Sequence, residues 1–460
     1  MEALRRAGRF EEALAGWDAA LAIAPDAPDL LCGKARVLQG FGRLDEATAL
    51  YRQALDREPD RYEAAFNLAL IAMQAGDWDE AERRAAPLRA RHPDAPGLAW
   101  IGARVAYGRG DAAAAREQLA ALCADPRLGG EQRADAQLML SDALDALGRF
   151  PEAFEAAVAG KAIQRELFAE RARSRERAVA RFERIETWFR SADAAPWRTA
   201  PAATPVRGEA SAHAFLVGFP RSGTTLLEQA LAGHSGVVAL EEAPTLAAAH
   251  AEFMSSPQGL ARLATLSPAQ AAPWRVRYWA EVAAHGVDPA GKLFLDKAPA
   301  GTVDLPLVAK LFPEARILFA VRDPRDVTLS CLRNNFQLNA MTYAFTDLAE
   351  AAACYAAGMA LAERYRAMLP LKVLEVRHEA LIADFASGLA EICRFLDLAP
   401  EPGMTDVAAT ANRRAVRTPS APQVRAGLNA KGVGRWRAYV DQLAPVLPAL
   451  EPWVRRFGYA

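Results

Sequence analysis

The chain has 460 residues, more than one ordinary hydrophobic core holds, so two or three domains are expected. Its 52% hydrophobic and 24% charged residues predict a soluble globular protein, and the formal net charge of −1 gives no sign of a nucleic-acid or membrane-surface partner. No apolar run is long enough for a membrane span, and the first residues do not read as a signal peptide. The five cysteines are scattered and the histidines show no metal-ligand spacing, so we expect reduced thiols, a cytoplasmic location and no metal.

The N-terminal third contains an internal repeat. A glycine recurs every 34 residues and a small alanine follows each one, and prolines recur at nearly the same period. The glycines are Gly8, Gly42, Gly76, Gly110 and, after 38 residues, Gly148; the alanines are Ala13, Ala47, Ala81, Ala115 and Ala153; the prolines are Pro25, Pro59, Pro93 and Pro126. The glycine makes the turn between two helices, the alanine lets them pack closely, and the proline ends the second helix. This pattern resembles the tetratricopeptide repeat, a 34-residue helix–turn–helix unit.

The resemblance implies a curved helical solenoid whose concave face binds an extended peptide or a partner protein. A structural spacer or a dimerisation arm fits the same repeats, so a homodimer is also open. The first repeat is short, and either the natural chain starts upstream or Met1 begins a half-repeat.

A connector follows the repeats, which we place at residues 1–157. Apolar residues at helical spacing predict one long helix from about Val158 to Phe189, and the Ala- and Pro-rich stretch from Ser191 to Ser211 reads as a linker. We therefore expect a connector at 158–211 and a second domain at 212–460.

The second domain alternates short apolar segments with helical stretches. This alternation predicts an α/β domain with a parallel sheet covered by helices on both faces. The expected strands are Ala214–Gly218, Val237–Leu240, Leu293–Leu295, Arg316–Val321 and Val373–Val376. Ligands in such folds bind at the carboxyl ends of the strands.

The segment after the first strand, Phe219-Pro220-Arg221-Ser222-Gly223-Thr224-Thr225, carries the strongest signal. A strand, a glycine turn and a helix start together form an anion cradle. The spacing from Gly218 to Thr225 is that of a Walker A loop, but Thr224 replaces its lysine, which argues against an ATPase or kinase. Arg221 supplies the cation and suits an anion with several oxygens. Taken alone, the loop also fits a simple turn with a surface arginine.

This loop resembles the 5′-phosphosulfate loop of sulfotransferases, which use 3′-phosphoadenosine 5′-phosphosulfate (PAPS), and its arginine is similar to that of tyrosylprotein sulfotransferases. The resemblance, over about residues 212–460, implies that Arg221 and the residues Ser222, Gly223, Thr224 and Thr225 bind the phosphosulfate. The family's membrane anchor and clear cysteine pairs are missing here, and the attached repeats are a further departure.

Two candidate catalytic residues follow the second and third strands. Glu242 ends a Glu-Glu pair spaced from Arg221 as the family's base is, so the resemblance implies that Glu242 deprotonates the acceptor. Lys297 lies in a Lys-x-Pro segment, which the resemblance assigns to the bridging oxygen of the donor. An acid pair at a helix start and a surface lysine are the plainer alternatives.

A second family segment follows the fourth strand. Arg322 and, eight residues on, Ser330 resemble the pair that binds the donor's 3′-phosphate, with Asp323 expected to cap a helix that Pro324 begins. Arg325 is a competitor for Arg322, although a helix-surface position suits it better.

The stretch Arg417-Thr418-Pro419-Ser420 and the basic run from Lys431 resemble the family's C-terminal substrate loop. The resemblance implies an active-site role for Ser420 and nucleotide contacts for Arg425 and Lys431.

The sequence thus predicts a repeat arm joined to a PAPS-dependent sulfotransferase, with 3′,5′-adenosine bisphosphate (PAP) as product and an acceptor hydroxyl on a tyrosine peptide, a glycan, a lipid or a small phenol. The alternatives are a non-catalytic repeat scaffold with a degenerate nucleotide-binding domain and a kinase-like phosphotransferase.

Overall fold

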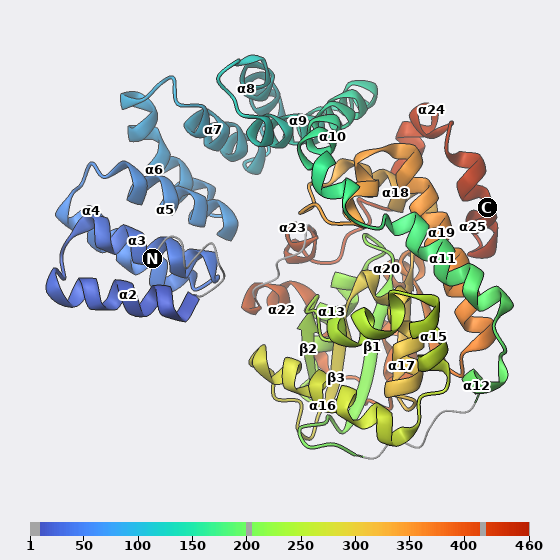
Figure 1. Cartoon of the computed structure of the whole chain (residues 1–460). Coiled ribbons are helices and arrows are strands. Elements are labelled where there is room, and N and C mark those ends of the chain that lie inside the picture. Colours follow the sequence, from blue (N-terminus) through green and yellow to red (C-terminus); the bar gives the residue numbers. More distant parts are fainter. Residues whose placement is uncertain (1–9, 199–204, 415–419, 460) are drawn as a thin grey trace. The chain divides into compact units, whose positions relative to one another are not determined.

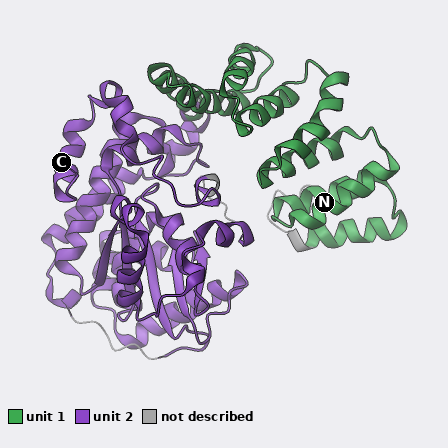
Figure 2. Ribbon diagram, turned by 180° about the vertical axis from the view of Figure 1, so that it is seen from behind, with its two compact units in different colours: residues 1–164 green, residues 165–460 purple. Residues whose placement is uncertain are grey.

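The computed structural model describes residues 10–198, 205–414 and 420–459. The chain divides into two compact units, residues 1–164 and residues 165–460 (Figure 2). Gly8 and the predicted loop segment Arg417-Thr418-Pro419 lie outside the described residues. Separate hydrophobic clusters form within each unit.

The first unit is built of antiparallel helix pairs (Figure 1). From α3 to α9, each helix packs on the one before it, which gives the array its repeated core. The helices are α2 (Phe10–Ile23), α3 (Pro28–Gly40), α4 (Leu44–Arg57), α5 (Tyr62–Ala75), α6 (Trp78–Arg91), α7 (Pro96–Gly108), α8 (Ala112–Ala124), α9 (Gly130–Ala146) and α10 (Phe150–Arg173).

The repeat markers lie where the sequence predicts them. The described glycines of the period make left-handed turns between paired helices, with φ of 76° at Gly42, 76° at Gly76, 87° at Gly110 and 75° at Gly148. The marker alanines are fully buried between helices, as at Ala47, Ala81 and Ala115. The prediction of a tetratricopeptide-type solenoid is confirmed.

One prediction for the connector was wrong. Instead of one helix over residues 158–189, α10 ends at Arg173 and α11 (Ala178–Ser191) begins after a short break. Glu176 in the break forms ion pairs with Arg181 and Arg184 of α11. The break contains no glycine or proline, so apolar spacing alone does not reveal it. The predicted linker also contains a short helix, α12 (Ala195–Arg198), whose Trp197 is buried.

The second unit contains a five-stranded parallel sheet in the order β2-β3-β1-β4-β5. All five predicted strands are present: β1 (Ala212–Gly218), β2 (Val237–Glu241), β3 (Leu293–Lys297), β4 (Arg316–Val321) and β5 (Lys372–Arg377). The other helices of this unit are α13 (Thr224–Ala232), α14 (Ala247–Ala249), α15 (Pro257–Ala264), α16 (Pro268–Ala284), α17 (Leu305–Leu311), α18 (Pro324–Arg333), α19 (Leu348–Met368), α20 (His378–Ala383), α21 (Phe385–Leu396), α22 (Val407–Arg413), α23 (Ala421–Arg425), α24 (Val440–Leu443) and α25 (Leu447–Arg456).

Both faces of the sheet are buried, as its continuous apolar strands predict. Leu216 of β1 and Leu318 of β4 pack with α13, α21 and α22 on one face. Phe215 and Phe294 point to the other face, where Tyr278 of α16 and Phe312 after α17 form an aromatic cluster with them. In the part of the chain that the structure describes, helices cover both faces of the sheet, so ligands can reach it at the ends of its strands.

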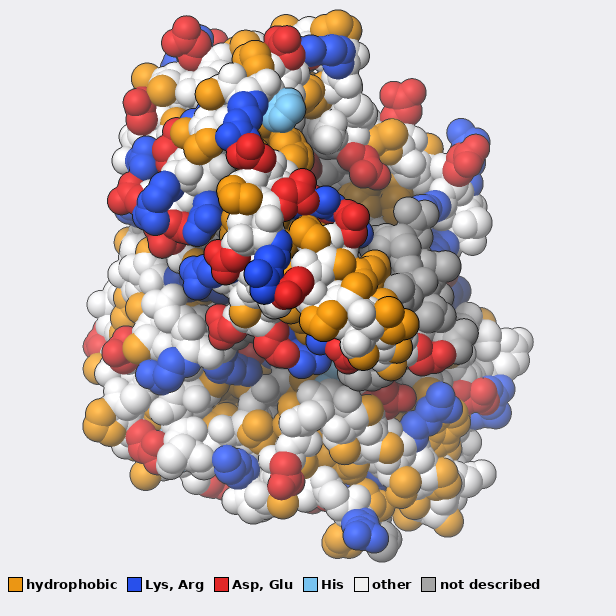
Figure 3. All heavy atoms as spheres, turned by 90° about the vertical axis from the view of Figure 1, so that its left-hand side faces the viewer, with side chains coloured by type: hydrophobic (Ala, Val, Ile, Leu, Met, Phe, Trp, Pro, Cys, Tyr) orange, Lys and Arg blue, Asp and Glu red, His pale blue; other side chains and the backbone are white. Residues whose placement is uncertain are grey.

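Among the described residues, none of the helices combines the length and the apolar character that crossing a membrane needs. Side chains of both charges are interspersed on the face shown in Figure 3. This mixture agrees with the net charge of −1.

Candidate active site at the carboxyl edge of the sheet

The loop between β1 and α13 has the shape of an anion cradle. Arg221 and Gly223 have left-handed backbone angles, with φ of 73° and 92°, so the chain turns sharply before α13 begins at Thr224. A Cβ at Gly223 would lie 2.5 Å from Nδ1 of His378, so no larger residue fits there. The first N–H groups of a helix have no partner within the helix, which makes this terminus suited to a negatively charged group.

The Arg221 side chain gathers three polar residues. Its Nε donates to Oγ of Ser330 at 2.9 Å, its Nη1 donates to Oγ of Ser420, and its Nη2 donates to Oε1 of Gln423 at 2.9 Å. Ser330 lies on α18 and Gln423 on α23, so segments about one hundred and two hundred residues away in the sequence meet at this guanidinium. The structure brings Arg221, Ser330 and Ser420 together.

Arg322 lies directly behind the loop. Its Nη1 donates to the backbone oxygen of Arg221 at 3.1 Å and its Nη2 to the backbone oxygen of Gly432. Its Nε is buried and has no hydrogen-bond partner among the described residues. Burial, with Arg322 and Arg221 nearby, lowers the pKa of His378 to about 3, so this imidazole stays neutral beside two cations. An unpaired buried N–H beside a second arginine fits an anionic ligand.

The predicted competitor, Arg325, is occupied elsewhere. It forms a two-pronged ion pair with Asp323, and its guanidinium stacks 3.9 Å from the ring centre of Trp436. Asp323 also caps α18 by accepting from the backbone N–H of Arg325, as expected. Arg325 is therefore held by Asp323 and Trp436, whereas Arg322 keeps one buried N–H without a partner among the described residues.

A buried lysine with three carboxylates forms the other half of the site. Lys297 Nζ lies 2.8 Å from Oε1 of Glu242, 3.2 Å from Oε1 of Glu241 and 3.4 Å from Oε2 of Glu228. Burial tends to lower the pKa of Lys297, but Glu228, Glu242 and Glu241 outweigh it and raise the pKa. Glu242 has a φ of 50°, and its N–H donates to the Lys297 backbone oxygen at 2.8 Å, which fixes the two residues together. Glu242, the predicted base, and Lys297, the predicted cation, are thus in direct contact.

Two predicted nucleotide contacts are less closely tied to the site. Arg425 is half-buried at the end of α23, a helix that packs on α13. Lys431 is exposed, and its neighbour Gly432 contacts Arg322. Asp326 holds this segment by accepting from the N–H groups of Gly434 at 2.7 Å and Trp436 at 2.8 Å.

The structure adds residues that sequence reasoning missed. Glu228, Gln423 and His378 contact predicted site residues, and Asp326 holds the segment that follows Lys431. A signal existed for Glu228, because it is the one acidic residue of α13 and its flanking residues Leu226, Leu227, Ala230 and Leu231 are apolar. Gln423, His378 and Asp326 carry no comparable signal in the sequence.

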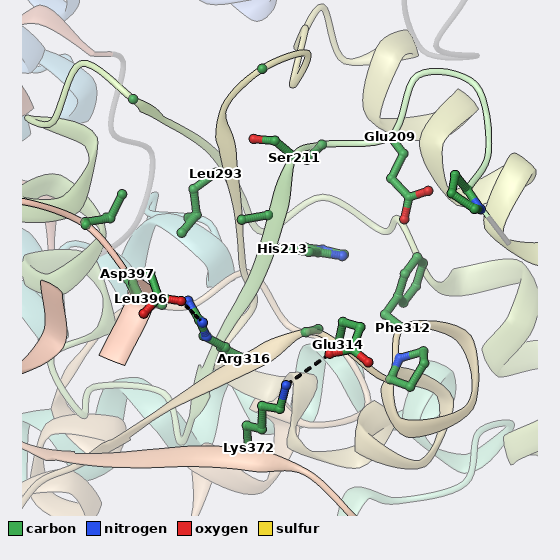
Figure 4. A pocket seen from close by; sticks show the side chains of 18 of the residues that line it. Glu209, Ser211, His213, Leu293, Phe312, Glu314, Arg316, Lys372, Leu396 and Asp397 are labelled. Carbon is green, nitrogen blue, oxygen red and sulfur yellow. Dashed lines mark hydrogen bonds and ion pairs between the residues drawn. The ribbon is translucent and has the colours of Figure 1, made fainter. Parts of the chain in front are cut away.

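A separate hollow of about 890 Å³ lies at the opposite edge of the sheet (Figure 4). Its lining includes Leu293 and Arg316, where β3 and β4 begin. Its charged side chains are paired with one another, Arg316 with Asp397 and Lys372 with Glu314 at 3.0 Å. The length of the strands separates this hollow from Arg221, Arg322 and Lys297 at the carboxyl ends.

Two family models match parts of the chain. Residues 214–402 match the model of the sulfotransferase family, and residues 40–100 match a tetratricopeptide-repeat model. Two separate parts of the chain therefore resemble known families, the first a tetratricopeptide repeat and the second a sulfotransferase domain. An uncharacterised Aquifex aeolicus protein is 28% identical over 244 residues, which are 52% of this chain and 32% of that protein, so the chain spans about a third of that relative's length.

Solved structures with similarity to the chain include two sulfotransferases. The sulfotransferase domain of a Synechococcus olefin synthase is 24% identical, with a TM-score of 0.37, over 54% of this chain and 97% of the domain. A sulfotransferase from Mycobacterium avium is 12% identical, with a TM-score of 0.32, over 74% of this chain and 95% of that protein.

Proposed function

We propose that residues 212–460 transfer a sulfuryl group from PAPS to an acceptor hydroxyl, with residues 1–157 as the repeat domain and 158–211 as the connector. The observation that supports this most is the meeting of two groups at one sheet edge. Arg221, Ser330 and Arg322 form a cationic group beside a helix start, and Lys297 pairs with Glu242 at the end of the adjacent strand β3. A donor with two anionic ends and an acceptor that must lose a proton need these two groups.

In the proposed reaction, Arg221 and the N–H groups of Ser222, Gly223, Thr224 and Thr225 bind the phosphosulfate end. Arg322 and Ser330 bind the 3′-phosphate, and Arg425 and Lys431 contact the nucleotide from the C-terminal segment. The orphaned Nε of Arg322 is a donor that such a phosphate satisfies. PAPS binds as a substrate, and PAP leaves as the product.

The chemical step needs one base and one cation. Glu242 removes the proton of the acceptor hydroxyl while the acceptor oxygen forms a bond to sulfur. The bond between sulfur and the bridging oxygen breaks, and the electron pair stays on the phosphate of PAP. Lys297, helped by Ser420, stabilises the charge that develops on that oxygen.

We propose that the repeats present a peptide or protein acceptor, a tyrosine hydroxyl being the first choice. Support comes from the repeat-family match, since such solenoids use their concave surface to bind extended partners.

An acceptor-dependent assay tests the proposal. The full chain is incubated with PAPS and either a tyrosine-containing peptide or 4-nitrophenol, and PAP is measured by chromatography. We expect PAP release that rises with the acceptor concentration. Binding of PAP without any turnover of PAPS, across phenols, peptides and sugars, would contradict the proposed activity and favour a non-catalytic scaffold.

A further inference from the structure

Glu228 is a buried acid that the proposed reaction does not use. It lies in the middle of α13, and its side chain is 0% exposed. One carboxylate oxygen lies 3.2 Å from Nη1 of Arg414, and the other lies 3.4 Å from Nζ of Lys297. A buried carboxylate is costly unless it is paired, so two cations at this point indicate a built arrangement.

The three carboxylates around Lys297 differ in their access to solvent. The side chain of Glu242 is 46% exposed and that of Glu241 is 16% exposed, whereas Glu228 and Lys297 are both 0% exposed. Glu242 can therefore reach an incoming acceptor, and Glu228 cannot. Arg414 secures Glu228 further, because its Nη2 donates to the backbone oxygen of Ala239 in β2 at 2.9 Å.

The proposed reaction changes the charge beside Lys297. When Glu242 takes up the acceptor's proton it becomes neutral, and the shortest ion pair of Lys297 is weakened. We infer that Glu228 is a positioning residue that keeps the Lys297 ammonium charged and in place at this moment, an inference that rests on the proposed function. Lys297 can then face the bridging oxygen without loss of its proton to the surroundings.

The charges around Lys297 support this role. Lys297 on β3 faces Glu228 from α13, and Glu241 and Glu242 from the end of β2. Its chain neighbour Asp296 lies on the opposite face of the sheet, hydrogen-bonded to Tyr278 and Thr245. Arg414 faces Glu228 from the segment after α22. Burial lowers the pKa of Lys297, and among the charges that raise it Glu228 acts most strongly. Removal of Glu228 therefore leaves a buried ammonium with less compensation.

The test follows the ionisation of Lys297 directly. The full chain has seven lysines, and labelling with ¹³Cε-lysine gives signals whose shift reports the charge of each ammonium. The Lys297 signal is identified by its loss in Lys297→Arg. In the native protein we expect no titration of this signal below about pH 10.5, the ordinary lysine range. In Glu228→Gln we expect its midpoint to fall by about one pH unit or more.

Further variants separate charge from structure. Glu228→Asp keeps the charge and should titrate close to the native protein, and Glu281→Gln removes an exposed carboxylate of α16 and should change nothing. Arg414→Gln removes a cation near the pair, so the Lys297 midpoint should stay or rise. This variant keeps the inference testable if Glu228→Gln does not fold, because a fall of the midpoint by a unit in Arg414→Gln would overturn it.

Calorimetry with PAP on the same samples separates this inference from the proposed function. PAP binding in the native protein and in Glu228→Gln, together with a lowered Lys297 midpoint in the variant, supports both. An unchanged midpoint in a folded Glu228→Gln that binds PAP overturns the role of Glu228 alone. No PAP binding in the folded native protein overturns the proposed function, with which this inference also fails.

Discussion

Arg322 is the residue whose removal tests the donor site most simply. Its guanidinium is buried against the phosphate loop and retains one N–H without a partner among the described residues. We predict that Arg322→Ala weakens PAP binding by about 2–5 kcal/mol, since one partner of a buried charged hydrogen bond is lost. Isothermal calorimetry measures this loss. Arg325→Ala is the matched control, because Arg325 is already paired with Asp323, and equal losses in both variants would contradict the assignment.

Glu242 tests the chemical step. Glu242→Gln keeps an oxygen that can accept from Lys297, so the local geometry should persist. We predict unchanged PAP affinity and a fall in turnover of about 100-fold or more, because the general base is lost. Steady-state PAP release with 4-nitrophenol gives the comparison. Native turnover in Glu242→Gln would move the base to another residue.

The strand pattern predicts the site residues that follow strands, whereas Ser330 and Ser420 could be named only through the family resemblance. Arg221, Glu242, Lys297 and Arg322 each come at or just after an apolar strand, and parallel strands end at a common edge. Glu228 meets Arg414 across 186 residues, and Arg221 meets Gln423 across 202. Such pairs depend on how α13, α22 and α23 pack, which no local pattern encodes.

At the scale of elements, strand β3 places two ionisable residues, Asp296 and Lys297, on opposite faces of the sheet. Lys297 faces the carboxylates described above, and its neighbour Asp296 accepts from Tyr278 at 2.7 Å and Thr245 at 2.8 Å. Burial raises the pKa of Asp296 from 3.8 to about 6 against these two hydrogen bonds. The folded protein therefore holds the Asp296 proton to a higher pH than the unfolded chain does.

This shift predicts a pH-dependent stability difference. Well below pH 3.8 Asp296 is protonated in both states and costs nothing. As the pH rises the unfolded state ionises first, and between about pH 3 and pH 7 the protein loses about 3 kcal/mol of stability from this group. The Asp296→Asn variant has no carboxyl to ionise here, so its stability relative to the native protein should rise by about 2 kcal/mol between pH 4 and pH 7. Urea unfolding at both pH values measures this, and a pH-independent difference would contradict it.

The limits of element prediction are clearest in the connector. The five strands were confirmed because their apolar runs are bounded by polar residues and turns. The break between α10 and α11 was missed because it contains neither glycine nor proline, the residues that usually mark the end of a helix in a sequence. Its cause is tertiary: Phe182 and Phe189 of α11 are buried in the second unit.

At the scale of the whole molecule, the two units have separate cores, so damage to one should spare the other's binding. A Cβ at Gly108 of α7 would lie 2.4 Å from the ring of Trp78. We predict that Gly108→Ala destabilises the repeats by about 1–3 kcal/mol, through overpacking, and leaves PAP affinity unchanged.

Thermal unfolding and calorimetry on the full chain test both parts of that prediction. Gly40→Ala is the control, because a Cβ there meets no atom within 4 Å. Equal melting curves for the two variants would show that close packing at Gly108 is unimportant. A loss of PAP binding in Gly108→Ala would show that the two units depend on each other.

We propose above all that the carboxyl edge of the sheet binds a nucleotide by its 3′-phosphate. Calorimetric titration of the full chain with PAP, beside 5′-AMP as control, tests this without knowledge of the acceptor. We predict micromolar binding of PAP and affinity for 5′-AMP lower by about 30-fold or more, equivalent to about 2 kcal/mol. No binding of PAP to the folded protein, or equal binding of PAP and 5′-AMP, would contradict the assignment of Arg322 and Ser330 and with it the proposed donor.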